Sequence, residues 1–229
     1  MYLSTLSSLC LGALVVLGSP IVRKRDIDLN EARCPDFCAG TNASEASGMY
    51  VCGDERLGPK TLPSTIPLGG IVGIDSTYRR FGGLCPGEYL AEWWDEEKHD
   101  WKWPVKDGYA IDTAGNATKF NFTLEKGVYI DRFGSERGAY TAPAGTPYAM
   151  RSLHPRNLNM QKDSVFPYNY YVYEVSKSMV VEAGPISPHF GQPGLGVQFR
   201  MPSSINTLIE QKLLSRVNLT ASPNWWDLS

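Results

Sequence analysis

An arginine and a phenylalanine at the end of a strand-like run carry side chains suited to binding a phosphate group and a heterocycle. The run from Gly127 to Ile130 leads into Asp131-Arg132-Phe133-Gly134. An arginine fork matches phosphate oxygens, and a neighbouring aromatic ring can stack on a heterocycle. Because a strand end would fix both side chains, this loop is a candidate site for a ligand with both groups. The alternative is a structural turn with a solvent-facing arginine.

A second candidate loop, residues 184–199, is rich in glycine. Four glycines fall within thirteen residues, and glycine lets the backbone approach a ligand closely. Gln198 then stands inside a strand-like run, where a buried amide must find hydrogen-bond partners. A cleft would supply them, so Gln198 is a second candidate for the site.

The signatures of several common enzyme classes are absent from the sequence. It has no phosphate-binding P-loop, no G-x-S-x-G, no H-E-x-x-H and no G-x-G-x-x-G that opens a helix. Its three histidines, His99, His154 and His189, are far apart and match no metal-ligand spacing, so we interpret them as structural or surface residues. No carboxylate pair stands out among the 24 acids, although a glycosidase pair would not reveal itself by spacing.

The composition predicts one folded unit rich in strands and loops. The 229 residues include 22 basic and 24 acidic side chains, for a net charge of −2, and 42% are hydrophobic. Without a basic excess, we do not expect nucleic-acid binding to be a main function of the chain. The 22 glycines and 16 prolines favour turns and strands over a helical bundle.

Apolar periodicity indicates an α+β fold with mostly antiparallel strands and few helices. One helix is expected over 204–216, where Ile205, Leu208, Ile209 and Leu213 repeat at helical spacing after a serine. Strands are expected over 119–124, 127–131, 168–175, 178–183 and 197–201. The tryptophans at 93, 94, 101 and 103 are expected to pack a core or a ligand cleft, with a sugar-binding platform as the alternative.

The N-terminal region predicts an exported protein. We interpret residues 1–18 as a signal peptide and 19–25 as a propeptide that ends at the dibasic Lys24-Arg25. No other apolar run is long enough to suggest a stable transmembrane segment. N-glycosylation sequons add support; their asparagines are Asn42, Asn116, Asn121 and Asn218.

Four cysteines remain in the mature chain, and their even number predicts two disulfides. They are Cys34, Cys38, Cys52 and Cys85, and their spacing leaves all three pairings open. A metal site is the less favoured alternative, because the spacing of Cys34 and Cys38 is not that of common zinc sites. We therefore divide the mature chain into a disulfide-rich region, 26–83, and a main domain, 84–229.

The two candidate loops together resemble the signatures of the tuberculosis necrotizing toxin (TNT) family. The first is carried by Asp131-Arg132-Phe133-Gly134 with Gly138, then residues 143–147 and 151–153. The second is carried by Gly184-Pro185-Ile186, residues 190–194, and Gly196 followed by Gln198. The resemblance spans roughly residues 84–217, and the export signals point to the secreted fungal branch, whose members are surface NAD glycohydrolases (NADases) with an added N-terminal region.

What this resemblance implies is hydrolysis of NAD+, and of NADP+ as well, to release nicotinamide. In the family an arginine, an aromatic residue eight positions on, and a glutamine carry the activity, and these correspond to Arg132, Tyr140 and Gln198. Gln192 is the alternative glutamine. The residues expected to bind substrate are Phe133, Gly134, Arg151, Gln192 and Gly194.

The resemblance also bears on cofactors and partners. NAD+ is the substrate, so no cofactor is needed for catalysis. The branch is associated with homodimers and with calcium near the C-terminus, but the tail 223–229 holds one acid, Asp227, and no calcium site is assigned. Arg137 and Leu195 depart from the family pattern without removing a proposed catalytic group.

Two alternatives to the hydrolase differ in what they predict for NAD+. An ADP-ribosyl transferase or cyclase would use the same cleft and exclude water. A non-catalytic secreted glycan-binding protein would leave NAD+ intact.

Overall fold

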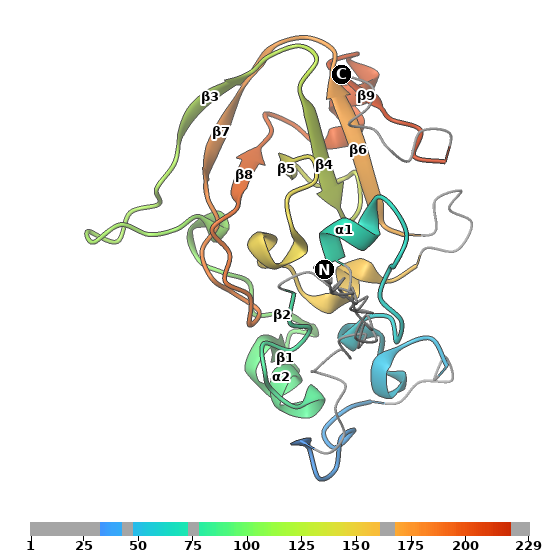
Figure 1. Cartoon of the computed structure of the whole chain (residues 1–229). Coiled ribbons are helices and arrows are strands. Elements are labelled where there is room, and N and C mark those ends of the chain that lie inside the picture. Colours follow the sequence, from blue (N-terminus) through green and yellow to red (C-terminus); the bar gives the residue numbers. More distant parts are fainter. Residues whose placement is uncertain (1–32, 43–47, 73–77, 161–167, 221–229) are drawn as a thin grey trace, which may run out of the picture.

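A seven-stranded antiparallel sheet forms the body of the protein (Figure 1). The computed structural model describes residues 33–42, 48–72, 78–160 and 168–220. The strand order is β3-β7-β8-β5-β4-β6-β9, and every neighbouring pair is antiparallel. The strands are β3 (Phe120–Leu124), β4 (Tyr129–Phe133), β5 (Tyr140–Pro143), β6 (Tyr170–Val175), β7 (Met179–Pro185), β8 (Val197–Arg200) and β9 (Leu214–Arg216). The expected α+β class is confirmed.

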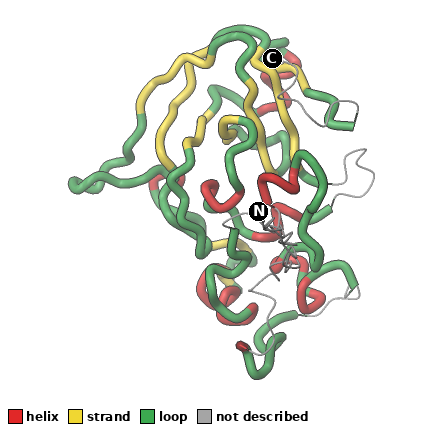
Figure 2. The backbone as a smooth tube through the Cα atoms, in the orientation of Figure 1, coloured by secondary structure: helices red, strands yellow, loops and turns green. Residues whose placement is uncertain are grey.

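Helices are few and short, and most of the remaining chain is loop (Figure 2). The α-helices are α1 (Leu68–Val72), α2 (Pro86–Trp93) and α3 (Ile205–Glu210). The 3-10 turns are η3 (Val51–Gly53), η4 (Glu55–Leu57), η5 (Lys106–Gly108), η6 (Tyr148–Arg151) and η7 (Pro155–Leu158). A small hairpin joins β1 (Trp94–Asp95) to β2 (Asp100–Trp101).

The helix expected over 204–216 is wrong in its second half. Helix α3 begins after Ser204, whose side chain caps it by accepting from the Thr207 N–H, and it ends at Glu210. The chain then turns through Lys212 with a positive φ of 56° and continues as β9. Pairing of β9 with β6 overrides the helical spacing, because Leu214 lies opposite Val175 and is buried in the core. Strand β5 was not expected at all.

The sheet buries a core on each face. On one face, α3 covers apolar side chains from β3, β4, β6, β7 and β8; among them are Leu124, Ile130, Tyr173, Val181 and Phe199. On the other face, Phe133 and Tyr170 pack with Tyr148 of η6 and with Leu68 of α1. The alternation along β4 therefore directs Ile130 to one core and Phe133 to the other.

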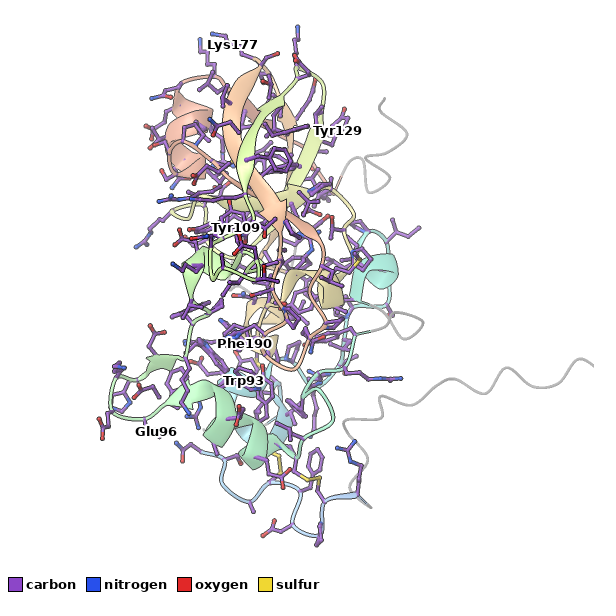
Figure 3. All side chains as sticks on the ribbon, turned by 90° about the vertical axis from the view of Figure 1, so that its left-hand side faces the viewer. Trp93, Glu96, Tyr109, Tyr129, Lys177 and Phe190 are labelled. Atoms are coloured by element: carbon purple, nitrogen blue, oxygen red, sulfur yellow. A yellow bond between two sulfur atoms is a disulfide. The ribbon has the colours of Figure 1, made fainter. Side chains whose placement is uncertain are left out.

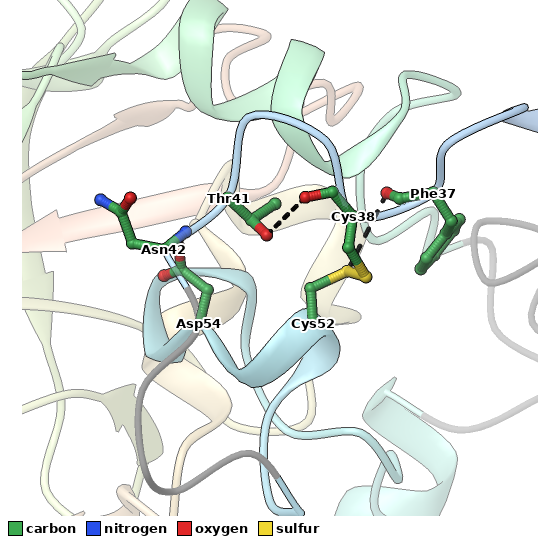
Figure 4. Close-up of a disulfide and its surroundings, with 6 residues drawn as sticks. All are labelled: Phe37, Cys38, Thr41, Asn42, Cys52 and Asp54. Carbon is green, nitrogen blue, oxygen red and sulfur yellow. Dashed lines mark hydrogen bonds between the residues drawn. A yellow bond between two sulfur atoms is a disulfide. The ribbon is translucent and has the colours of Figure 1, made fainter.

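Two disulfides cross-link the N-terminal part, and the structure decides the pairing that the sequence left open. Cys34 pairs with Cys85 at the start of α2, and Cys38 pairs with Cys52. Around the second disulfide, Thr41 Oγ1 donates to the Cys38 carbonyl at 2.7 Å (Figure 4). These links hold a loop-rich segment that has little regular structure of its own.

The N-terminal part packs directly against the second candidate loop. The backbones of Gly82 and Gly191 touch so closely that a Cβ on Gly82 would lie 2.5 Å from the Gly191 Cα. Both residues also have a positive φ. Glycine is therefore required at each position by the close contact and by the backbone conformation. The boundary between 26–83 and 84–229 stays a prediction.

Most of the clustered tryptophans form core. Trp94 and Trp101 are buried with Tyr89 of α2 and Phe190. Figure 3 shows Trp93 beside Phe190 where the sheet meets the N-terminal part, and their ring centroids are 5.6 Å apart. Only Trp103 of the four is largely exposed, at 53%, so these four tryptophans do not form an extended aromatic platform for a sugar.

None of the helices in the described ranges is long and apolar enough to cross a membrane. The signal peptide and propeptide expected at 1–25 lie outside the described residues.

The buried His154 should make folding sensitive to acid. Burial among Trp101, Trp103 and Phe190 lowers the pKa of His154 to about 3, and the nearby charge of Arg156 adds to this. Below about pH 6.5 the histidine binds a proton in the unfolded chain but not in the folded chain. The free energy of unfolding is therefore highest above that pH and falls as the pH drops towards 3.

A His154→Phe variant removes this proton and keeps a ring for the stacking. Between about pH 5 and 6.5, its free energy of unfolding in urea should fall less steeply than that of the unchanged chain, by up to about 1.4 kcal/mol per pH unit. Carboxylates titrate alike in both proteins, so parallel pH curves would contradict this role of His154.

Candidate active site

The two candidate loops line one cavity of about 470 Å³. It opens at the ends of β4, β5 and β8, which are neighbours in the sheet. Six of the residues expected at the site line it: Arg132, Phe133, Gly134, Tyr140, Arg151 and Gln198. All three proposed catalytic residues are therefore brought together, although they come from three different strands.

Arg132 is held by the backbone of the loop that follows it. Its Nε donates to the Ser135 carbonyl at 2.8 Å and its Nη1 to the Tyr140 carbonyl at 2.6 Å. Burial lowers the pKa of Arg132, and the charge of Glu136 opposes this shift. An arginine stays protonated in any protein environment, so a fixed cation lines the cavity with Nη2 as its remaining donor group.

An ion pair between β9 and the loop after β4 stabilises the loop that holds Arg132. Arg216 donates two hydrogen bonds to the Glu136 carboxylate, at 2.7 and 2.6 Å, and the Tyr173 hydroxyl donates a third at 2.9 Å. These bonds lower the pKa of Glu136 against the effect of its burial. The loop that holds Arg132 is thereby tied to two strands.

Arg151 lines the cavity, but its guanidinium is occupied by the protein itself. It forms a two-pronged ion pair with the buried Asp131, at 2.5 and 2.7 Å, and its Nε donates to the Thr146 carbonyl at 2.8 Å. Its Cζ lies 5.1 Å from the centre of the Phe133 ring. In this geometry each guanidinium nitrogen of Arg151 already bonds to the protein and holds the loop beside Phe133, and the substrate-binding role of Arg151 stays a prediction.

Tyr140 and Gln198 meet at the turn η5. Gln198 Nε2 donates to the backbone carbonyl of Asp107 at 2.9 Å, which leaves the amide oxygen Oε1 as an acceptor. Burial raises the pKa of the Tyr140 hydroxyl, and the Asp107 carboxylate beside it raises that pKa further. Tyr140 therefore remains protonated and can donate a hydrogen bond.

The structure separates the two glutamines that the sequence could not separate. Gln192 is 97% buried outside the cavity lining, and its Nε2 donates to the Arg79 carbonyl. Gly194 is also outside the lining; it has a φ of +64°, and a Cβ there would lie 2.7 Å from the Ser187 carbonyl oxygen. Both residues shape the loop, whereas Gln198 reaches the cavity.

Several lining residues carried no signal that sequence reasoning used. Trp103 was noted only as part of a tryptophan cluster, and Asp107 only as one acid among many. Asn157 of η7 lies outside both candidate loops, whereas Ser152, Ser187 and Phe190 belong to those loops but had no predicted role. A positive φ at Asp107 and Phe190, 58° and 50°, marks them as special in the structure, but nothing in their residue type announces it.

In the parts of the chain that the structure describes, no three His, Cys, Asp or Glu side chains are grouped to hold a metal ion. The tail with Asp227 lies outside those parts. All four sequon asparagines are exposed, which leaves each accessible to glycosylation.

Comparison with known proteins identifies the class. Residues 123–217 match the family model described as tuberculosis necrotizing toxin, and this chain belongs to that family. Among its relatives is the conidial surface nicotinamide adenine dinucleotide glycohydrolase nadA of Aspergillus fumigatus. That protein is 45% identical over 190 residues, which cover 82% of this chain and 79% of the relative.

Solved structures include more distant matches. Tuberculosis necrotizing toxin, complexed with its immunity factor, is 20% identical with a TM-score of 0.40, over 92% of this chain and 98% of that one. Rhs1-CT, in complex with its cognate immunity protein, is 14% identical with a TM-score of 0.32, over 51% of this chain and 84% of that one.

Gly138 should prove essential for the position of Arg132. A Cβ at residue 138 would lie 2.0 Å from Arg132 Nη2 and 2.5 Å from its Cζ, so Gly138→Ala must displace the guanidinium. We expect binding of a nucleotide pyrophosphate, measured by calorimetry, to weaken by about tenfold or more, as misplaced groups commonly cost. Gly48→Ala, which meets no atom within 4 Å, is the matched control. Equal affinities for the two variants would contradict this role.

Proposed function

We propose that this protein is a secreted or cell-surface NAD+ glycohydrolase that cleaves the bond between nicotinamide and ribose. The observation that carries the proposal is a cavity that joins Arg132, Tyr140 and Gln198, in a chain 45% identical to a conidial surface NAD glycohydrolase. The signal peptide expected at 1–18, the two disulfides and the exposed sequons support a place outside the cell.

The chemistry explains how such a cavity can work without an ordinary glycosidase pair. Nicotinamide in NAD+ is already a cationic leaving group, so no general acid has to protonate it. The carbon–nitrogen bond breaks towards an oxocarbenium-like ribose, and the enzyme must hold that geometry and admit one water. This reaction needs no cofactor.

Each proposed catalytic residue has a role that its contacts permit. Arg132 binds the pyrophosphate through the donors that Ser135 and Tyr140 leave available. Tyr140 and Phe133 pack against the nicotinamide or ribose. Gln198, anchored through Nε2, offers Oε1 to the reacting ribose or to the attacking water.

Two finer proposals follow from the family. We infer that NADP+ is cleaved as well, and that two copies of the chain form a homodimer, which sedimentation equilibrium of the secreted protein would reveal as a doubled mass. Calcium binding stays unassigned to any residue.

The test of the activity is product analysis with a matched pair of variants. The purified secreted chain, incubated with NAD+ and resolved by liquid chromatography, should give nicotinamide and ADP-ribose in equal amounts. Gln198→Ala should lower kcat by about a hundredfold, because it removes a positioned polar group from the reacting centre. Gln211→Ala, an exposed glutamine outside the cavity, should leave the rate unchanged.

Other outcomes would redirect the proposal. Cyclic ADP-ribose or labelled protein would identify a transferase or cyclase. Intact NAD+ at high protein concentration would refute the enzyme altogether.

Arg132 should act mainly on substrate binding. Arg132→Ala removes the fixed cation, so we expect the KM for NAD+ to rise by about tenfold or more, the value of a charge-assisted bond. Arg137→Ala, an exposed arginine in the same loop that does not line the cavity, is the control. A KM that moves equally in the two variants would exclude Arg132 as the pyrophosphate ligand.

A further inference from the structure

One acid lines the cavity among its described residues, and it has no role so far. Asp107 stands in η5, at the cavity, with an exposed side chain. Two other carboxylates lie near Arg132: Asp131 is fully buried and paired with Arg151, and Glu136 is paired with Arg216. Asp107 forms no ion pair within the described chain. Arg200 is close enough to interact electrostatically with Asp107, but its ion pair is with Glu182, at 3.1 Å.

The backbone at Asp107 is held in an unusual conformation. Lys106, Asp107 and Gly108 follow one another with φ values of 54°, 58° and 78°, which two residues with a Cβ adopt at a cost. Three hydrogen bonds maintain it: Gly108 N–H to the Val105 carbonyl, Ser187 N–H to the Gly108 carbonyl, and Gln198 Nε2 to the Asp107 carbonyl. A proposed catalytic residue thus fixes the turn that presents the acid.

Arg132 and Asp107 contact opposite ends of the residue Tyr140. Arg132 Nη1 is bonded to the backbone carbonyl of Tyr140, whereas the Asp107 carboxylate lies beside the hydroxyl of the same tyrosine. Arg132 and Gln198 stand on β4 and β8, with β5 between them, so roughly 10 Å of sheet separates their backbones. The cavity therefore has a cationic end and an anionic end.

This polarity matches a substrate with an anionic middle and a cationic end. We propose that Asp107 is a further catalytic residue, whose carboxylate contacts the nicotinamide ribose while Arg132 holds the pyrophosphate. The inference rests on the proposed function and adds to it the direction in which the dinucleotide lies.

The reaction creates the charge that Asp107 would stabilise. As the bond between C1′ and nitrogen breaks, its electron pair leaves with nicotinamide, which becomes neutral, and the positive charge moves to C1′ and the ring oxygen of the ribose. Water adds to C1′ and releases its proton to solvent, which completes ADP-ribose. A carboxylate against the ribose is closer to the charge in the transition state than in the substrate, so it lowers the barrier.

Asp107→Asn is the variant that isolates the charge. Asparagine tolerates a positive φ as well as aspartate does, and the backbone carbonyl that accepts from Gln198 is unchanged. We expect kcat for NAD+ to fall about tenfold or more with a KM within about threefold, and the melting temperature to be kept. Asp36→Asn, at an exposed acid outside the cavity, should change none of these.

A second readout distinguishes catalysis from support of the fold. A cationic pyrrolidine analogue of ribose, which mimics the charged transition state, should inhibit Asp107→Asn more weakly, by about the factor lost in kcat. Asp107→Gly also accepts the positive φ and should give the same losses, which covers the case in which the asparagine variant fails to fold.

Failure of this inference differs from failure of the proposed function. If the unchanged chain hydrolyses NAD+ and Asp107→Asn keeps kcat within about twofold, or binds the cationic analogue equally well, then Asp107 is not catalytic. If the unchanged chain leaves NAD+ intact, the proposed function itself is refuted.

Discussion

The buried ion pair between Asp131 and Arg151 is the interaction on which the rest of the site depends. The Asp131 carboxylate is fully inaccessible and accepts four hydrogen bonds: two from Arg151, one from the Tyr170 hydroxyl at 2.8 Å and one from the Gly145 N–H at 2.9 Å. Those donors come from β6 and from the loop after β5, and Asp131 itself belongs to β4. One carboxylate therefore holds three segments together. Removing either partner would leave a buried charge uncompensated, which typically costs about 3–5 kcal/mol.

The two loops of the cavity depend on each other through this pair. Arg151 belongs to the turn η6, and the backbone of η6 receives the glycine-rich loop: the Gly194 and Gly196 N–H groups donate to the Ala149 and Met150 carbonyls at 3.2 and 3.0 Å. A Cβ on Gly196 would lie 2.5 Å from the Met150 carbonyl oxygen. The sequence suggested that these glycines let the backbone approach a ligand. In the structure they let the glycine-rich loop pack against the backbone of η6, and this packing positions Gln198.

Residue type and position in the chain drew attention to Arg132 and Gln198, whereas Tyr140 was predicted only from the family resemblance. Arg132 and Gln198 were recognisable because an arginine at a strand end and a glutamine inside a strand are both out of place without a cavity. Arg151 was expected to bind substrate, but its partner, Asp131, is twenty residues away, and no periodicity reveals a buried ion pair. Asp107 was missed because its importance comes from its backbone conformation and its neighbours, which only the folded chain defines.

The fold was likewise predictable from the sequence only in part. Alternating and apolar runs predicted β3, β4, β6, β7 and β8, since their side chains repeat with the period of a sheet. The helix over 204–216 was too long because its helical spacing continues to Leu213, and only the pairing of β9 with β6 in the folded chain overrides that spacing. Four cysteines predicted two disulfides, but their pairing depends on which parts of the chain meet.

The strand order also constrains how this protein can fold. Of the six pairings in the sheet, only β4 with β5 and β7 with β8 join strands that follow one another in the chain. These two hairpins carry Arg132, Tyr140 and Gln198, whereas η5, η6 and η7 supply the rest of the cavity lining and the non-local pairing of β5 with β8 brings the two hairpins together. The other four pairings close long stretches of chain, which makes folding slow, because the entropy of closing them is lost before the contacts that reward it are made. A newly exported chain therefore passes through a long period with strand edges unpaired, and the hairpins that carry the site are the segments able to form first.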